Sequence, residues 1–284
     1  MKDWLIGAAK ALAIWAALLA GNVAGAMVVT LPASAAGDGP LGAGQALLAV
    51  NALFALVLAP LAARLTGPYW RRAATLFLLL YLVETLLSTI ESLFFGRFLH
   101  LPAGLLTSLA AMNAVKSACA ALVAAALWRG AGEAAAIDGL KWKLPAIVLL
   151  YVLLYFGAVQ LIAWRSAAVR AYYGEGLAID MAPLVLLQIG RGAIWAGLAF
   201  LLARSLRGPA PARAALAGAA FAILMAGPLL YPNALMPWAV REVHLVEIGV
   251  SNFLFGLIAV SLLGWSGRPA MVEPTAEPAG QAGA

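Results

Sequence analysis

Two acidic residues lie inside a segment that is otherwise apolar enough for a lipid bilayer. Glu84 and Glu91 occur in the stretch YLVETLLSTIESLFF, residues 81–95, with Ser88 between them. Their spacing of seven places both acids on one face of a helix. A charged side chain at the bilayer centre costs roughly 2.5–3.5 kcal/mol on insertion scales, so it usually faces a bundle interior and marks a pathway or site. The acids are therefore candidates for binding an ion or carrying a proton. The alternative is a structural role, in which they pair with basic residues and hold helices together.

Lys116 is the expected partner of Glu84. A helix rises about 1.5 Å per residue, so counting from the expected loop near residue 99 places these two residues at nearly the same depth on consecutive helices. Each charge would offset the desolvation cost of the other, and removal of one alone should be strongly destabilising. The sequence therefore predicts an internal salt bridge.

A second group of charges is expected nearer the outer surface. By the same count Glu91, Arg191 and Glu247 lie in one half of the bilayer, so that one arginine could serve two acids. Gly190 and Gly192 flank the arginine and permit either close helix approach or a break in the helix, both of which suit a binding site. A structural Glu–Arg–Glu clamp is the alternative. The buried acids outnumber the buried bases, which leaves one carboxylate to titrate or to bind a cation.

Other polar side chains would extend this site, because they follow the charged residues at helical or near-helical spacing: Asn113, Ser117, Gln188, His244 and Asn252. His244 stands one turn before Glu247 at a membrane boundary. A pH-sensitive gate is one interpretation, since histidine titrates near neutrality; the simpler one is a boundary histidine that hydrogen-bonds to lipid headgroups or water. Asn22 and Asn51 are more isolated and are expected to form hydrogen bonds between helices.

The composition indicates an all-α polytopic membrane protein. Hydrophobic residues make up 64% of the 284 residues, charged residues 11%, and the mean hydropathy is +0.96, which lies far outside the range of soluble domains. A transmembrane helix needs about 20 apolar residues. Eight windows satisfy this and together form a helical domain over 1–266: 5–31, 45–65, 73–95, 101–128, 144–164, 183–206, 213–230 and 244–265. Residues 267–284 are rich in Pro, Ala and Gly and are expected to form a disordered tail.

Basic residues predict the orientation. Those flanking the expected spans fall mostly on the side of the N-terminus, which favours a cytoplasmic location for both termini in a bacterial inner membrane. This asymmetry accounts for the net charge of +6, and nothing indicates nucleic-acid binding. The first apolar run is long and carries Lys10 and Asn22, so it is expected to be a membrane span rather than a cleaved signal peptide.

The residue inventory offers little for metal or cofactor chemistry. Cys119 is the single cysteine and lies within the fourth expected span, so no intrachain disulfide and no cysteine metal cluster is possible. The sequence lacks HExxH, serine-triad and phosphate-loop signatures. We therefore expect no bound metal and no cofactor.

A short internal match indicates a repeat. The letters LVE, separated by three residues from a following Ser, occur at 82–88 and again at 245–251, and FFG or FLFG follows each. These segments belong to the third and eighth expected helices. An offset of five helices reverses the direction of the chain, so a repeat on this basis would have inverted topology, as in many secondary transporters.

Two resemblances to known families rest on these segments. STIESLFF and REVHLVEIGVSNFLFG resemble segments of uncharacterised bacterial multi-spanning membrane proteins, which carry no known activity. ESLFFGRFL (91–99) resembles the EExxxR motif of the CPBP glutamate-type intramembrane proteases, and His244 and Asn252 are similar to that family's later elements. The second resemblance implies water activation by glutamate and histidine. The sequence departs from the motif, however, because Ser92 stands in place of the second Glu and no Arg occupies the motif's last position.

Three functions follow from these observations. The first is a transporter or channel-like protein for a small solute or ion, coupled to protons or cations, in which Glu91 titrates, Arg191 holds an anionic group and the Glu84–Lys116 pair gates. The second is a membrane-embedded enzyme acting on a lipid or isoprenoid at Glu91, Arg191, Glu247 and His244. The third is a non-catalytic subunit that associates with another membrane protein.

Overall fold

The structure is a computed structural model, and the residues that it describes are 2–30, 37–96, 101–130, 132–174 and 180–265. Within these ranges eight helices are long and apolar enough to cross a membrane. The prediction of an all-α membrane protein with eight spans is therefore confirmed. The expected tail, 267–284, lies outside the described residues.

Short connections separate the spans, and three of the spans contain or end in a short helical turn. Their bounds are α1 (Lys2–Met27), α2 (Ala43–Arg64), a third span made of α3 (Tyr69–Tyr81), the π-helical turn η1 (Leu82–Leu86) and α4 (Leu87–Phe94), then α6 (Leu105–Leu127), α7 (Leu140–Leu161), the 3₁₀ turn η2 (Ala163–Arg165), α8 (Ala167–Tyr173), α9 (Met181–Ser205), α10 (Ala210–Ala226), the 3₁₀ turn η3 (Gly227–Leu230) and α11 (Trp238–Gly264).

Several helices begin before the apolar windows do. α11 starts six residues before the expected position 244, directly after Pro237, because Arg241 and Glu242 are helical although they are charged. α3 likewise starts at Tyr69, directly after Pro68. Proline suits the start of a helix because the missing N–H would have no partner in the first turn. Hydropathy marks the apolar part of a span rather than the helix that carries it.

The two halves of the chain share a sequence at equivalent loops. The segment LAARLTGPYWRRAA (61–74) ends α2 and begins α3, and LARSLRGPAPARAA (202–215) ends α9 and begins α10; eight of the 14 positions are identical. Gly67 and Gly208 occupy equivalent positions and both have positive φ, +87° and +113°. An L side chain is disfavoured in this region, so the same turn is built twice.

These loops meet at a symmetric pairing, which we call the seam (residues 64–67 and 205–208). Leu65 and Leu206 form an antiparallel bridge. The Thr66 N–H donates to the Ser205 carbonyl at 2.9 Å, and the Arg207 N–H donates to the Arg64 carbonyl at 3.0 Å. The two bonds are equivalent, because Thr66 corresponds to Arg207 and Ser205 corresponds to Arg64. An approximate two-fold axis therefore passes between Leu65 and Leu206.

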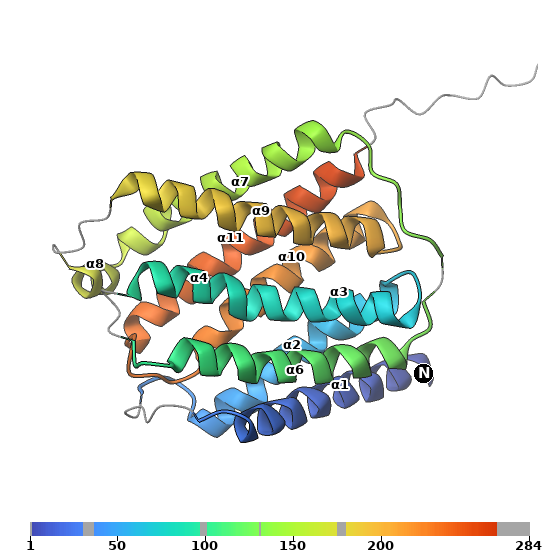
Figure 1. The fold of residues 1–284 in the computed structure, drawn as a ribbon, viewed down its shortest axis with the longest axis horizontal. Helices are drawn as coiled ribbons and strands as arrows, with labels where there is room; N and C mark the ends of the chain where they lie inside the picture. Colours follow the sequence, from blue (N-terminus) through green and yellow to red (C-terminus); the bar gives the residue numbers. More distant parts are fainter. Residues whose placement is uncertain (1, 31–36, 97–100, 131, 175–179, 266–284) are drawn as a thin grey trace, which may run out of the picture.

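Helix packing follows the same symmetry. In the first half α1 packs on α2 and α6, and α3 packs on α6; in the second half α7 packs on α9 and α11, and α10 packs on α11. α1 and α7 lie at opposite edges of the bundle, with the remaining spans between them (Figure 1). The halves meet where α2 contacts α10 and where α3 contacts α9.

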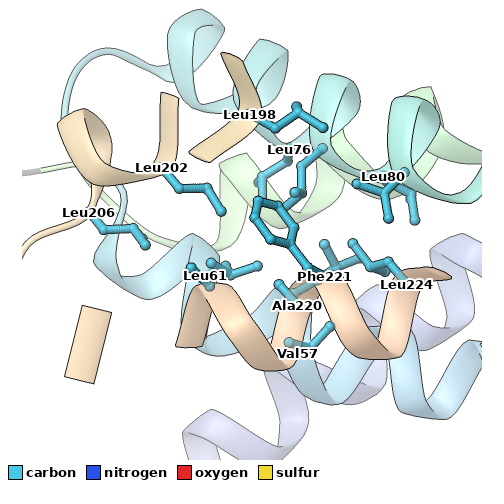
Figure 2. Packing of buried hydrophobic residues seen from close by; sticks show 14 of the residues in the cluster. Val57, Leu61, Leu76, Leu80, Leu198, Leu202, Leu206, Ala220, Phe221 and Leu224 are labelled. Atoms are coloured by element: carbon cyan, nitrogen blue, oxygen red, sulfur yellow. The ribbon is translucent and has the colours of Figure 1, made fainter. Parts of the chain in front are cut away.

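The core between the halves consists of equivalent buried positions. Figure 2 shows this packing around Phe221, with leucines from both halves converging on the ring. Each equivalent pair is at most 3% exposed: Phe54 with Trp195, Val57 with Leu198, Leu61 with Leu202, Leu80 with Phe221, and Val83 with Leu224. The third span therefore corresponds to the seventh in a parallel repeat, whereas the short LVE match had related it to the eighth in an inverted one.

Candidate functional site

The predicted internal salt bridge is present. Lys116 Nζ on α6 bonds to Glu84 Oε1 on η1, and the two side chains are 2% and 4% exposed. Gly21 allows α1 to cover the lysine, because a Cβ there would lie 2.7 Å from Lys116 Cα. The acid sits in a single π-helical turn, a feature that is frequent at functional sites. Glu84 Oε2 is buried without a hydrogen-bond partner among the described residues.

Two asparagines extend the polar interior between the first spans. Asn22 Nδ2 on α1 donates to Asn51 Oδ1 on α2 at 3.2 Å, which confirms the expected helix–helix hydrogen bond. Each amide also donates to a backbone carbonyl one turn earlier in its own helix, Leu18 and Leu47 respectively. These bonds satisfy the donors locally, so the pair has a structural role.

A second ion pair joins the halves near the end of the bundle opposite the seam, which we call the distal end (residues 87–94, 155–173, 181–191 and 238–247). Arg191 Nη2 lies 3.0 Å from Glu91 Oε2. Tyr155 on α7 donates its hydroxyl proton to the other carboxylate oxygen at 3.0 Å. Arg191 is 3% exposed, whereas Glu91 is 25% exposed. The arginine is therefore buried while the acid keeps access to the surroundings.

Further contacts position Arg191 on α9. Its Nη1 donates to Gln188 Oε1 at 2.9 Å, one turn earlier on the same helix. The guanidinium carbon lies 5.9 Å from the ring centroids of both Tyr151 and Tyr155, a cation–π distance. Gly192 brings α9 against α7, because a Cβ there would lie 3.1 Å from the Tyr151 ring. α9 is continuous through this region, so of the two expected uses of the flanking glycines the structure supports close approach at Gly192.

Glu247 does not share Arg191, so the expected Glu–Arg–Glu clamp is wrong. Its Oε2 lies 2.6 Å from His244 Nδ1, one turn earlier on α11. His244 Nε2 lies 3.1 Å from the Tyr173 hydroxyl on α8. The histidine side chain is only 14% exposed, so the interpretation of a boundary histidine satisfied by lipid or water is also wrong. The partner of Glu247 is therefore His244 on its own helix, whereas counting residues by depth had predicted Arg191 on another helix.

Tyr173 was not foreseen from the sequence, since it lies in a short helix without apolar periodicity. Burial raises the pKa of its hydroxyl, and the charge of Glu91 and, to a smaller degree, that of Glu247 raise the pKa further. The Tyr173 hydroxyl lies within hydrogen-bond distance of His244 Nε2, so Tyr173 connects α8 to the His244–Glu247 pair. We call this group and the Glu91–Arg191–Tyr155 group together the distal network, because both lie at the distal end.

Arg241 has a structural role beside this network. Its side chain is fully buried and donates to the carbonyls of Met236, Leu229 and Tyr231 at 2.9, 2.8 and 2.6 Å. Its Nη2 lies 3.1 Å from Asp38 Oδ1. The guanidinium connects the loop before α2 to the start of α11. The carbonyls satisfy its N–H groups, and the Asp38 carboxylate supplies its counter-charge.

The remaining predicted residues lie apart from the ion pairs. Asn113 is half-buried on α6, one turn before Lys116. Asn252 donates to the Ile248 carbonyl of its own helix at 2.9 Å. In the part of the chain that the structure describes, no group of three or more His, Cys, Asp or Glu residues could hold a metal ion.

Comparisons with known proteins add no family. No protein-family model matches the chain, and neither the curated proteins nor the solved structures contain a significant match. The two resemblances therefore rest on the quoted motifs alone, and residues 97–100, within and directly after the protease-like motif, lie outside the described residues. What the protein does must be argued from the charges inside the bundle.

Proposed function

We propose that the protein is a proton-coupled transporter of a small solute, with its binding site in the distal network. The observation that carries the proposal is the Glu91–Arg191 pair, in which a partly exposed acid neutralises a buried base across the two halves of the bundle. Ionisable residues at such positions usually mark a substrate or proton path. We place the protein in a bacterial inner membrane with both termini in the cytoplasm, on the basis of the positive-inside rule.

Exposure distinguishes Glu91 from the other buried acids. The side chains of Glu84 and Glu247 are 4% and 7% exposed, against 25% for Glu91. Of the three, Glu91 is therefore the acid that can most readily exchange protons with its surroundings. Protonation removes the negative charge that holds Arg191, so the proton state of Glu91 controls whether the arginine is free to bind something else.

The repeat supplies a means of movement. Several transporter folds consist of parallel repeats related by an axis along the membrane normal, and transport proceeds by rocking one repeat against the other around a central site. Here the seam joins the halves at the end where α1 begins, while Glu91 and Arg191 join them near the opposite end. Release of the distal pair would let that end open. The Glu84–Lys116 pair lies between the two and serves as the internal gate.

Replacement of Glu91 by Gln tests this function. The protein would be reconstituted in liposomes loaded with a pH-sensitive dye, and proton entry measured on addition of a panel of carboxylates, amines, sugars and monovalent cations. We expect at least one class to drive proton entry in the wild type and none in Glu91→Gln. Glu242→Gln, at an exposed acid near the same end, is the matched control and should transport normally. Normal proton-coupled transport by Glu91→Gln would refute the proposal.

An enzyme acting on a lipid is the second candidate, favoured by an apolar groove. This groove of about 460 Å³ lies between α2, α10 and α11 and is lined by Leu53, Ile223, Leu245, Gly249 and Phe253 among others. A lipid chain held there could present its headgroup to the distal network. Mass spectrometry of lipids that remain bound after purification would reveal a retained substrate or product. Purification only as part of a larger complex would instead favour the third candidate, a subunit with a membrane protein partner.

A further inference from the structure

We infer that the transported solute carries a carboxylate, which Arg191 binds in exchange for Glu91. This rests on the proposed function and names its substrate class. The starting observation is a pair of buried N–H groups on one face of α9 that lack acceptors among the described residues: Gln188 Nε2 and Arg191 Nε. Their spacing of three residues places them one above the other along the helix.

Unpaired buried donors are costly and need an explanation. Gln188 is fully buried and Arg191 is 3% exposed. Both unpaired atoms are donors, so a ligand that satisfies them must bring acceptors. A carboxylate offers about four acceptor positions and no donor. Amines and metal cations, by contrast, would add positive charge beside a buried guanidinium.

The existing Arg191–Glu91 contact leaves part of the guanidinium unpaired. Glu91 Oε2 lies 3.0 Å from Arg191 Nη2, while the other carboxylate oxygen accepts from Tyr155. Arg191 Nη1 is bonded to Gln188 Oε1, and Nε is unpaired. A carboxylate that approached the guanidinium edge could form two parallel bonds, the arrangement that arginine favours. The ligand would thus gain a contact that Glu91 does not make.

Charge balance links this exchange to the proton. When Glu91 is ionised, Arg191 is neutralised and an anion has little to gain. When Glu91 takes a proton, the buried guanidinium loses its partner, and an anion then restores neutrality. One proton on Glu91 therefore accompanies one carboxylate group on Arg191, and together they add no net charge to the site. Tyr155 can remain hydrogen-bonded to the neutral Glu91.

Ligand binding to the purified full-length protein tests the assignment. Succinate, glutarate and benzoate would be compared with succinamide and with alkylamines by isothermal titration calorimetry, and repeating each titration in buffers of different ionisation enthalpy counts the protons taken up. We expect carboxylates alone to bind, with proton uptake approaching one per site above neutral pH. Glu91→Gln mimics the protonated acid, so it should still bind carboxylates but without proton uptake.

Removal of the arginine gives the decisive comparison. Arg191→Gln alone leaves Glu91 without its partner and could fail to fold, so Glu91→Gln is compared with the double variant Glu91→Gln/Arg191→Gln, which buries no charge at either position. The dissociation constant should rise roughly 10- to 100-fold in the double variant, the usual loss when a charge-assisted hydrogen bond is removed. Arg165→Gln, at an exposed arginine near the same end, should bind as the wild type does.

The outcomes separate this inference from the proposed function. Equal carboxylate binding by Glu91→Gln and the double variant would overturn the inference, and so would binding by amines or neutral solutes alone, or binding by none of the carboxylates. In each case Glu91-dependent proton transport of another solute could still be observed and would sustain the proposed function. Carboxylate binding that depends on Arg191 but drives no proton entry into liposomes would retain the site and refute transport.

Discussion

The two halves of the molecule share a scaffold but not their charges. The equivalent of Glu84 in the second half is Met225, and the equivalent of Arg191 in the first half is Val50. All four positions are buried. Around the seam, by contrast, Leu, Gly, Pro and Arg recur at matching positions. The packing and the turn have been retained in both copies, whereas the residues proposed to act on the solute occur once.

The largest expected effect comes from breaking the internal ion pair. Lys116→Met leaves Glu84 buried without a counter-charge and should lower the free energy of unfolding by roughly 3–5 kcal/mol. Glu84→Met/Lys116→Met should recover most of that loss, since it gives the first half the residue that the second half has at Met225. Thermal unfolding in one detergent measures both. If the double variant is as unstable as the single one, the pair is not interchangeable with apolar packing.

A cross-link between α4 and α10 tests the proposed movement of the halves. Ser88 Oγ on α4 and Met225 Sδ on α10 lie 3.8 Å apart across the interface. A cysteine is shorter than Met225, so Ser88→Cys/Met225→Cys in a Cys119→Ser background would be bridged by a short bis-methanethiosulfonate reagent. The bridge should reduce proton-coupled uptake at least tenfold, reversibly with a reductant. Undiminished uptake in the cross-linked protein would show that the halves do not separate there.

The matched cross-link lies at the seam. Residues opposite each other in an antiparallel pair have Cα atoms about 4.5–5.5 Å apart, within the range that a disulfide spans. Leu65→Cys/Leu206→Cys in the same background should therefore cross-link as well, yet retain most of the uptake, because the seam is the proposed pivot. Equal inhibition by both cross-links would contradict a pivot at this position.

The sequence allowed some of these features to be predicted, and geometry explains which. Hydropathy predicted eight spans, and counting residues along consecutive helices predicted the Glu84–Lys116 pair. The same counting failed for Glu247, because it gives the depth of a residue but not the direction in which its side chain points. His244, one turn away on the same helix, supplied the closer partner. Sequence identity between the two parallel repeats is clearest in the loops, because many apolar residues can replace one another within the spans.

The seam also makes a matched prediction for the glycines. Gly67→Ala and Gly208→Ala each force an alanine to positive φ and should lower stability by about 1–2 kcal/mol. The two losses should agree closely, because the same turn is disturbed in each copy. Gly197→Ala, with open space around a Cβ on helix α9, is the control and should cause no loss. A large loss of stability at one glycine alone would show that the two turns contribute unequally to the free energy of unfolding.

The smallest expected effect concerns the contact of Asp38 with Trp238 and Arg241, which joins the two halves at the distal end. The backbone N–H of Trp238 donates to the Asp38 carboxylate and, as the largest cause, lowers its pKa; a hydrogen bond from Arg241 lowers the pKa as well. A depressed folded-state pKa means that the stabilisation is present above the unfolded pKa of about 3.9 and is lost as pH falls through the folded value. Asp38→Asn should therefore unfold at a slightly lower temperature than the wild type at pH 7, and the difference should shrink toward pH 3. Because Asp38 is largely exposed, solvent screens the interaction, so the effect is small. If the difference in unfolding temperature persisted unchanged at pH 3, its cause would be altered loop geometry rather than the lost charge.

The same variant tests the proposed movement. If Asp38→Asn also speeds proton-coupled uptake, the contact between Asp38 and the start of α11 must break when the halves separate.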